Sequence, residues 1–267
     1  MGVVNVTPDS FSDGGALQGV EGAVAHALAL DRAGADILDI GGESTRPGAA
    51  PVSAEAELAR VLPVLRTLRP LTSRRISIDT CKPEVAEAAV EAGADIWNDV
   101  SALSAPGAAE LAARLGCDVV LMHMQGEPRT MQSAPRYDDV LAEVCAFLEA
   151  RAEAAQAAGV ARERIWLDPG IGFGKTLEHN LALLAGLERI VALGFPVLLG
   201  ASRKRFIAAI DPGGQSPLDR LGGSLAAALG GAKAGVAAVR VHDVAETVQA
   251  LEVQAAILAA GGISPCR

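Results

Sequence analysis

The sequence predicts an α/β protein, and within that class a single-domain (β/α)8 TIM barrel over residues 1–267. Short apolar segments alternate with segments of helical periodicity along the whole chain. Nearly continuous apolar strands are expected when both faces of a parallel sheet are buried. No linker divides the chain into domains. Eight strand–helix units in about 250 residues are typical of this barrel, and a doubly wound open sheet is the alternative.

The first strand–helix unit begins at the first residue of the sequence. Residues 1–6 are almost all apolar and predict a strand. The polar loop 7–15 follows and carries one aromatic residue, Phe11. Residues 20–33 have helical periodicity, and the helix is expected to end at Gly34, a common helix-ending residue.

The second unit contains the stretch around which a site is expected. The apolar run 37–41 predicts a buried strand, and residues 54–68 predict a helix. Between them, residues 41–48 read Gly-Gly-Glu-Ser-Thr-Arg-Pro-Gly, a loop that leaves the carboxyl end of a strand. Thr45 and Arg46 place a hydroxyl and a guanidinium side by side, which suits a phosphate or a carboxylate. The alternative is a solvated turn with an incidental arginine.

The remaining six units repeat this pattern. Glycines such as Gly93, Gly116 and Gly159 end the helices, and Pro83 suits a first helical turn. The expected strands are 75–79, 96–99, 118–123, 165–168, 196–200 and 237–241. The expected helices are 82–92, 107–115, 137–158, 177–193, 218–234 and 244–260, with a long loop over 124–136.

Composition narrows the class of protein. The net charge of −9 argues against a nucleic-acid binder, although a locally basic site for an anion remains compatible with it. No apolar run approaches the roughly 20 residues of a membrane span, and no signal segment opens the chain. The four cysteines are scattered without a C-x-x-C pair, which is typical of reduced thiols. We therefore expect a cytoplasmic protein that binds neither nucleic acid nor membrane.

Polar side chains follow most of the expected strands. In a barrel these side chains converge on one face, although each alone also fits a helix cap, a turn or a satisfied strand residue. They are Asn5, Asp39, Thr45, Arg46, Asp79, Asn98, His123, Asp168, Lys204, Arg240 and His242.

Two groups among these residues suggest a ligand. Asp79 and Asp168, with Asn98, can accept hydrogen bonds from the N–H and NH2 groups of a planar heterocycle. Arg240 and His242 are two apart on an expected strand, so they point to the same side and can grip one phosphate.

Two motifs that resemble known metal or phosphate sites do not match them. Residues 169–176 resemble a phosphate loop, but Pro169 stands where the pattern needs glycine. The four histidines show no zinc-ligand spacing with cysteines. Mg2+ needs only one or two protein oxygens beside substrate phosphates, so Asn5 is a candidate ligand.

The ordered motifs together resemble the dihydropteroate synthases, the folate-pathway enzymes that sulfonamides inhibit. The resemblance covers nearly the whole chain. It is carried by residues 5–15, 41–48, 78–80, 98–99, 121–126, 168–170, 202–204 and 240–242.

The resemblance implies a (β/α)8 barrel that joins p-aminobenzoate to 6-hydroxymethyl-7,8-dihydropterin diphosphate, giving 7,8-dihydropteroate and pyrophosphate. A dissociative, SN1-like displacement at the pterin CH2 is expected, with Mg2+ as cofactor. A typical member is a homodimer, so a homodimer is expected here.

The resemblance also assigns roles to residues. The pterin would be held by Asp79, Asn98, Met122, Asp168 and Lys204. The diphosphate would be held by Asn5, Thr45, Arg46, Arg240 and His242, with Asn5 on the metal. The p-aminobenzoate pocket would contain Phe11, Thr45, Pro47, Lys204 and Arg205. The residues expected to act in catalysis are Asp79, Asp168, Lys204, Arg240 and His242.

Two departures from the family pattern stand out. Many members carry a hairpin segment before the first strand, which covers the barrel bottom, whereas this sequence starts at that strand. We expect its loss to affect stability more than chemistry. Arg205 stands where many relatives have a serine thought to help hold the aminobenzoate carboxylate. Arginine can bind that carboxylate itself, or leave it to the backbone N–H at the helix start.

Two rival functions remain. A methyltetrahydrofolate-dependent methyltransferase would share the pterin residues but not the diphosphate grip of Thr45, Arg46, Arg240 and His242. A non-catalytic pterin-binding protein would keep the pocket without releasing pyrophosphate.

Overall fold

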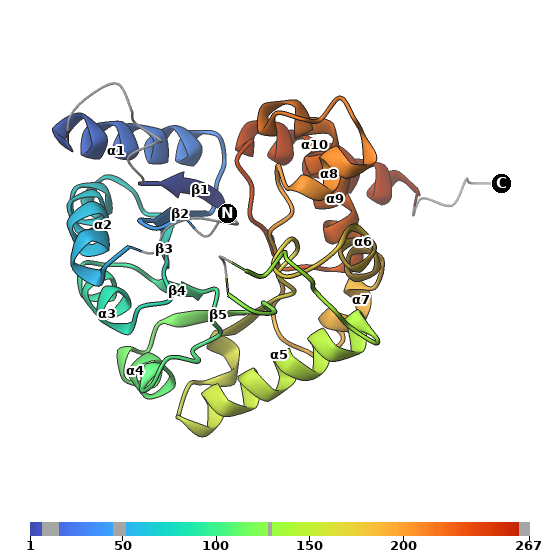
Figure 1. The fold of residues 1–267 in the computed structure, drawn as a ribbon. Coiled ribbons are helices and arrows are strands. Elements are labelled where there is room, and N and C mark those ends of the chain that lie inside the picture. Colours follow the sequence, from blue (N-terminus) through green and yellow to red (C-terminus); the bar gives the residue numbers. More distant parts are fainter. Residues whose placement is uncertain (7–15, 45–51, 128–129, 262–267) are drawn as a thin grey trace.

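The computed structural model describes residues 1–6, 16–44, 52–127 and 130–261. In these ranges, strands surround a central axis and helices surround the strands (Figure 1). The strands are β1 Gly2–Asn5, β2 Ile37–Gly41, β3 Arg75–Asp79, β4 Ile96–Asp99, β5 Asp118–Met122, β6 Ile165–Asp168, β7 Leu198–Leu199 and β8 Ala238–Val239. The helices are α1 Ala16–Arg32, α2 Ala54–Leu68, α3 Pro83–Glu91, α4 Ala108–Leu115, α5 Val140–Ala157, α6 Leu177–Ala185, α7 Leu187–Val191, α8 Arg205–Ile210, α9 Leu221–Ala234 and α10 Val244–Gly261. Short 3-10 turns are η2 Arg69–Leu71, η3 Arg162–Arg164 and η4 Pro217–Arg220.

The strands form a ring of parallel pairs. β1 to β6 make one sheet in chain order, and β7 pairs with β8. A parallel bridge between Leu167 and Val197 continues the pairing from β6 towards β7. A second parallel bridge, between Gly2 and Val241, joins the chain after β8 to β1. The α/β barrel class expected from the sequence is confirmed, because the first and last strands are neighbours instead of opposite edges of an open sheet.

The strand register aligns the polar ends of the strands. Asn5 pairs with Gly41, Gly41 with Asp79, and Asp79 with Asn98. Met122 pairs with Asp168 in the same way between β5 and β6. Because all these strands are parallel, their carboxyl ends bring these residues to one edge of the barrel.

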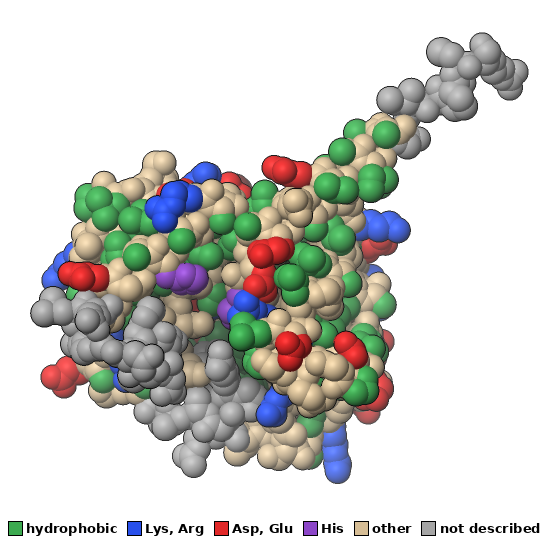
Figure 2. Space-filling view, turned by 90° about the horizontal axis from the view of Figure 1, so that it is seen from above, with side chains coloured by type: hydrophobic (Ala, Val, Ile, Leu, Met, Phe, Trp, Pro, Cys, Tyr) green, Lys and Arg blue, Asp and Glu red, His purple; other side chains and the backbone are tan. Residues whose placement is uncertain are grey.

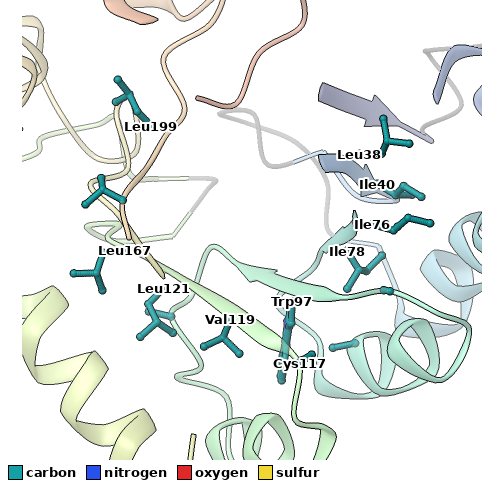
Figure 3. Packing of buried hydrophobic residues seen from close by; sticks show 14 of the residues in the cluster. Leu38, Ile40, Ile76, Ile78, Trp97, Cys117, Val119, Leu121, Leu167 and Leu199 are labelled. Atoms are coloured by element: carbon teal, nitrogen blue, oxygen red, sulfur yellow. The ribbon is translucent and has the colours of Figure 1, made fainter. Parts of the chain in front are cut away.

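Alternation along each strand separates two apolar regions. In β2, Leu38 and Ile40 belong to the large cluster between strands and helices, whereas Ile37 packs with Ile96, Val120 and Leu198 in a separate, smaller cluster. Figure 3 shows the side chains of the large cluster along the strands. Because neighbouring strand residues point to opposite faces, Asp39 shares the face of Ile37 and lies inside the barrel.

Five elements differ from the sequence prediction. The strands predicted over 196–200 and 237–241 are only two residues long. The single helix predicted over 177–193 is wrong, because this range is divided at Gly186 into α6 and α7. A Cβ on Gly186 would lie 2.2 Å from Leu141, so α5 packs closely against this point. α8 was not predicted. α5 was predicted to begin at residue 137 but begins at Val140, because the Asp139 side chain caps its first turn.

No helix within the described ranges is long and apolar enough to cross a membrane.

Candidate functional site

Arg240 joins two buried carboxylates at the edge where the strands end. Its Nε donates to Asp39 Oδ2 at 2.6 Å, and its Nη2 donates to Asp79 Oδ2 at 2.8 Å. Asp39 is fully buried and the Asp79 side chain is only 10% exposed. Two carboxylates therefore share one guanidinium, which leaves this part of the site with excess negative charge.

Asp79 retains a free acceptor. Its Oδ1 is buried and has no hydrogen-bond partner among the described residues. Burial raises the pKa of Asp79 to about 7; Arg240 opposes the shift and the charge of Asp39 adds to it. The neighbouring Asn98 places its Nδ2 3.4 Å from Asp39 Oδ1. A buried, unpaired acceptor is costly unless a ligand donates to it, so this oxygen marks a binding position.

Asp168 and Lys204 form the opposite part of the site. Asp168 Oδ1 accepts from the Gly170 backbone N–H at 2.7 Å, and burial raises the pKa of Asp168 against the attraction of Lys204. Lys204 Nζ donates to the Ile171 carbonyl, and it lies 4.6 Å from the centre of the Phe173 ring. Burial lowers the pKa of Lys204 to about 8, and the charge of Asp168 opposes that shift.

Gly200 lies where the two parts meet. A Cβ built there would be 3.8 Å from both Asp168 Oδ2 and Lys204 Nζ, and 4.0 Å from Arg240 Cβ. Gly200 therefore lies in ordinary contact distance of the Asp168 carboxylate, the Lys204 amino group and the Arg240 side chain. The structure brings together the four charged residues Asp79, Asp168, Lys204 and Arg240, as the sequence predicts.

His242 occupies a separate position beside this cluster. Its Nδ1 lies 3.1 Å from Ser202 Oγ, and its backbone N–H donates to the same hydroxyl at 3.2 Å. β8 ends at Val239, so Arg240 and His242 follow the strand instead of alternating within it. In this structure Arg240 contacts carboxylates, and a joint grip on one phosphate stays a prediction.

The other predicted site residues are spread around the same edge. Asn5 ends β1 and is half-buried, Met122 ends β5 and is buried, and Arg205 is exposed at the start of α8. Phe11, Thr45, Arg46 and Pro47 lie outside the described residues, so their roles stay predictions.

Asp39 has no predicted role in the sequence, although in the structure it accepts the shorter of the two Arg240 hydrogen bonds. The signal was present, since Asp39 is the only charged residue in the apolar run of β2. A carboxylate inside an otherwise apolar strand is rarely buried without a partner.

A second missed cluster stands on the other side of β2. Lys82 Nζ donates to Glu43 Oε2 at 2.5 Å and to Glu57 Oε2 at 2.6 Å. Glu43 Oε1 also accepts from the Val52 backbone N–H at 2.8 Å, so the residues on either side of 45–51 are linked. No local sequence pattern marks this cluster, because its members come from three separate segments.

A parallel barrel with paired carboxylates and cations at the carboxyl ends of its strands is the arrangement of an enzyme for a small polar ligand. The sequence profile of the family described as "Pterin binding enzyme" matches residues 1–242. Dihydropteroate synthase of Escherichia coli K12 is 51% identical over 260 residues, covering 97% of this chain and 92% of the relative.

Solved structures agree with this match. Xanthomonas albilineans dihydropteroate synthase with 4-aminobenzoic acid is 54% identical, with a TM-score of 0.92, covering 97% of this chain and 92% of that one. The Yersinia pestis enzyme in a sulfonamide drug complex is 45% identical, with a TM-score of 0.91, and the match covers 97% of this chain and 94% of that one. The chain belongs to the pterin-binding enzymes, and within them to the dihydropteroate synthase family.

Proposed function

We propose that this chain joins p-aminobenzoate to 6-hydroxymethyl-7,8-dihydropterin diphosphate and releases 7,8-dihydropteroate and pyrophosphate. The observation that carries the proposal is Asp79 Oδ1 beside Asn98, a buried oxygen that has no hydrogen-bond partner in the part of the chain that the structure describes. A pterin ring presents N–H and NH2 donors along one edge, and a carboxylate accepts from such donors. The Xanthomonas albilineans relative has been solved in complex with 7,8-dihydropteroate.

The pterin would lie between the two halves of the site. Asp79 and Asn98 would bind one edge of the ring, and Asp168 with Lys204 the other. Met122, buried at the end of β5, would line the pocket. This arrangement places buried carboxylates on both sides of a ring that becomes positively charged as the pyrophosphate leaves.

The diphosphate would meet the cationic side of the site. Arg240 and His242 are the described candidates, and Thr45 and Arg46 complete the proposed set. An amide oxygen such as that of Asn5 suits Mg2+, and one protein ligand suffices when phosphates and water supply the rest. Asn5 is half-buried at the strand-end edge, so its position fits this role. Bound Mg2+ would stabilise the negative charge of the leaving pyrophosphate.

The protein groups favour a dissociative displacement. Asp79 and Asp168 stabilise positive charge on the pterin methylene, while the cations stabilise the departing diphosphate. The arylamine of p-aminobenzoate is already nucleophilic, so the site needs no strong general base. Phe11, Thr45, Pro47, Lys204 and Arg205 are proposed to surround the aminobenzoate, where sulfonamides would compete.

Pyrophosphate release tests this function directly. With pterin diphosphate, Mg2+ and the wild-type protein, we expect release that depends on p-aminobenzoate and that falls when EDTA removes Mg2+. A methyltransferase would show no such release and would accept a methyltetrahydrofolate instead. Pterin binding without release from the folded protein would establish the non-catalytic alternative and contradict the proposal.

We also propose a homodimer that uses α9, α10 and the groove beside them. The end of α10 extends away from the body of the molecule (Figure 1). Figure 2 shows hydrophobic side chains on this projecting part. Ile257 and Leu258 are 66% and 61% exposed, and an apolar groove of about 410 Å³ lies between α6, α8 and α9, lined in part by Phe206 and Ile210. Exposed apolar surface of this kind is typical of protein contacts.

Light scattering after size-exclusion chromatography measures this assembly. We expect the wild type at twice the chain mass and Ile257→Glu shifted towards the monomer, because the charge disrupts an apolar contact. Leu71→Glu is the control, since Leu71 is also exposed but lies in η2, away from this face. A monomeric wild type at micromolar concentration would refute the assignment.

A cytoplasmic location is proposed on the state of the thiols. Cys81, Cys117 and Cys145 are free, and burial raises the pKa of Cys81 and of Cys117 to about 11. Unpaired thiols kept in their protonated form are compatible with a reducing compartment.

A further inference from the structure

The glycine-rich segment 169–176 is the part of the chain that resembles a phosphate loop, and the proposed function gives it no role. Its backbone groups are already used within the protein. The carbonyls of four consecutive residues, 171 to 174, each accept a hydrogen bond from a side chain. The donors are Lys204 on Ile171, Gln132 on Gly172, Lys175 on Phe173 and Tyr137 on Gly174.

Several N–H groups of the same segment donate to protein acceptors. Gly170 donates to Asp168 Oδ1 at 2.7 Å, and Gly172 donates to Asn180 Oδ1 at 2.7 Å. A phosphate loop presents free N–H groups to its ligand. This segment instead presents carbonyls to cationic and polar side chains, so it acts as a support for side chains.

Lys175 is the most enclosed of these donors. It is 3% exposed, and its Nζ lies 2.9 Å from His123 Nδ1, 3.3 Å from the His123 carbonyl and 3.0 Å from the Phe173 carbonyl. Burial lowers the pKa of Lys175 to about 7, and below that pH the three donors of its ammonium group match these three acceptors. These contacts tie the residue that follows β5 to the segment that follows β6.

His123 is held as an acceptor in this arrangement. Burial, together with the charge of Lys175, lowers the pKa of His123 to about 3, so its imidazole is neutral near pH 7. Its ring packs edge-on against Phe147 with centroids 4.9 Å apart. Donation from Lys175 requires an unprotonated Nδ1, which fixes the tautomer with the proton on Nε2.

The segment is pressed against the chain at 123–125, where His123 lies. Gly170 and Gly174 have φ of +66° and +62°, and a Cβ on them would lie 1.9 Å from the His123 carbonyl oxygen and 2.4 Å from the Gln125 carbonyl oxygen. There is no room for the segment to shift towards β5. Close packing thus limits movement of the segment towards β5, and the hydrogen bonds of Lys175 join the segment to His123.

Lys204 depends on the same segment. Its Nζ donates to the Ile171 carbonyl and lies over the Phe173 ring, and Lys175 binds the carbonyl of that same Phe173. Phe173 therefore contacts both Lys175 and Lys204.

We infer that Lys175 is a positioning residue, which holds Phe173 and Ile171 so that they seat the amino group of Lys204 beside Asp168. The inference rests on the proposed function only for the ligand that Lys204 then meets, a pterin diphosphate.

Lys175→Met tests the inference, because methionine keeps much of the volume and removes the three hydrogen bonds. We expect the KM for the pterin diphosphate to rise by about tenfold to a hundredfold, as for a misplaced binding group, and the KM for p-aminobenzoate to rise as well, because Lys204 is proposed to contact both substrates. Tyr137→Phe is the matched control, since it removes a tie to the same segment at Gly174, away from Lys204. A KM for the pterin substrate that moves equally in both variants would overturn the inference.

A second readout does not depend on activity. Acetylation of Lys204 by acetic anhydride, followed by mass spectrometry over a range of pH, reports the environment of its amino group. We expect Lys175→Met to change the rate and pH dependence of this labelling, and Tyr137→Phe to leave them as in the wild type. An unchanged Lys204 profile in folded Lys175→Met contradicts the inference, even for a wild type that releases no pyrophosphate.

If Lys175→Met does not fold, the wild type still provides a test. Nitrogen-15 NMR of labelled histidine is expected to show His123 as the Nε2-protonated tautomer from pH 5 to pH 6, where Lys175, whose pKa burial lowers to about 7, is still an ammonium group. A protonated Nδ1 in that range would exclude the hydrogen bond from Lys175 and overturn the inference.

Discussion

Asp79→Asn is expected to lower kcat/KM for pyrophosphate release by roughly a hundredfold or more, as does the loss of one charge-stabilising group in other active sites. The amide keeps the shape of the side chain but removes the negative charge that faces the developing cation. It also presents an N–H2 group where the ligand itself donates. Steady-state kinetics with varied pterin diphosphate measures the effect.

The same substitution is expected to stabilise the folded protein. Asp39 and Asp79 share the single guanidinium of Arg240, and burial raises the pKa of Asp79 from 3.8 to about 7. Between these pH values the folded protein keeps a proton that the unfolded chain has lost, so the wild type loses stability as pH rises from about 4 to 7. Asparagine carries no such penalty, so the advantage of Asp79→Asn grows through this window and is constant above it.

Urea unfolding at pH 5 and pH 8 measures this difference. Asp36→Asn serves as the control because the Asp36 side chain is 87% exposed, and its effect is expected to be small at both pH values. A variant Asp79→Asn that is less stable than the wild type at pH 8 would contradict this prediction. It would mean that the negative charge of Asp79 stabilises the folded protein without ligand.

Arg240→Ala is expected to cost about 3–5 kcal/mol of unfolding free energy, because it leaves two buried carboxylates without their cation. Activity should be lost as well, since the proposed diphosphate site loses a positive charge. Urea unfolding and pyrophosphate release measure the two effects separately. Arg114→Ala is the matched control, because Arg114 pairs with Glu87 on the surface and its removal is expected to change stability little.

A triple variant separates the two roles of Arg240. Asp39→Asn and Asp79→Asn added to Arg240→Ala remove the uncompensated charges, so stability is expected to recover while activity does not. If the triple variant remained as unstable as Arg240→Ala, packing of the arginine stem rather than ion pairing would explain the loss.

The sequence by itself determined most of the fold. The predicted ranges 37–41, 75–79, 96–99 and 165–168 coincide with β2, β3, β4 and β6, and 54–68 coincides with α2. These segments are recognisable because apolar runs, helical periodicity and caps are local properties of the chain. Asp79, Asn98 and Asp168 could be placed at one edge because parallel strands in a barrel all end on the same face.

Only the tertiary structure decided how the charges are paired. Arg240 meets Asp39 across 201 positions of sequence, a contact that exists only because the end of β8 returns to β1. Lys175 meets His123 for a similar reason, since β5 and β6 are neighbours in the ring. At Gly186, between α6 and α7, a distant residue, Leu141, leaves no space for a Cβ in its present position. Local sequence patterns predict the helix or strand in which a residue lies and the face to which it points. The partner of a buried charge depends instead on which strands are neighbours in the closed barrel.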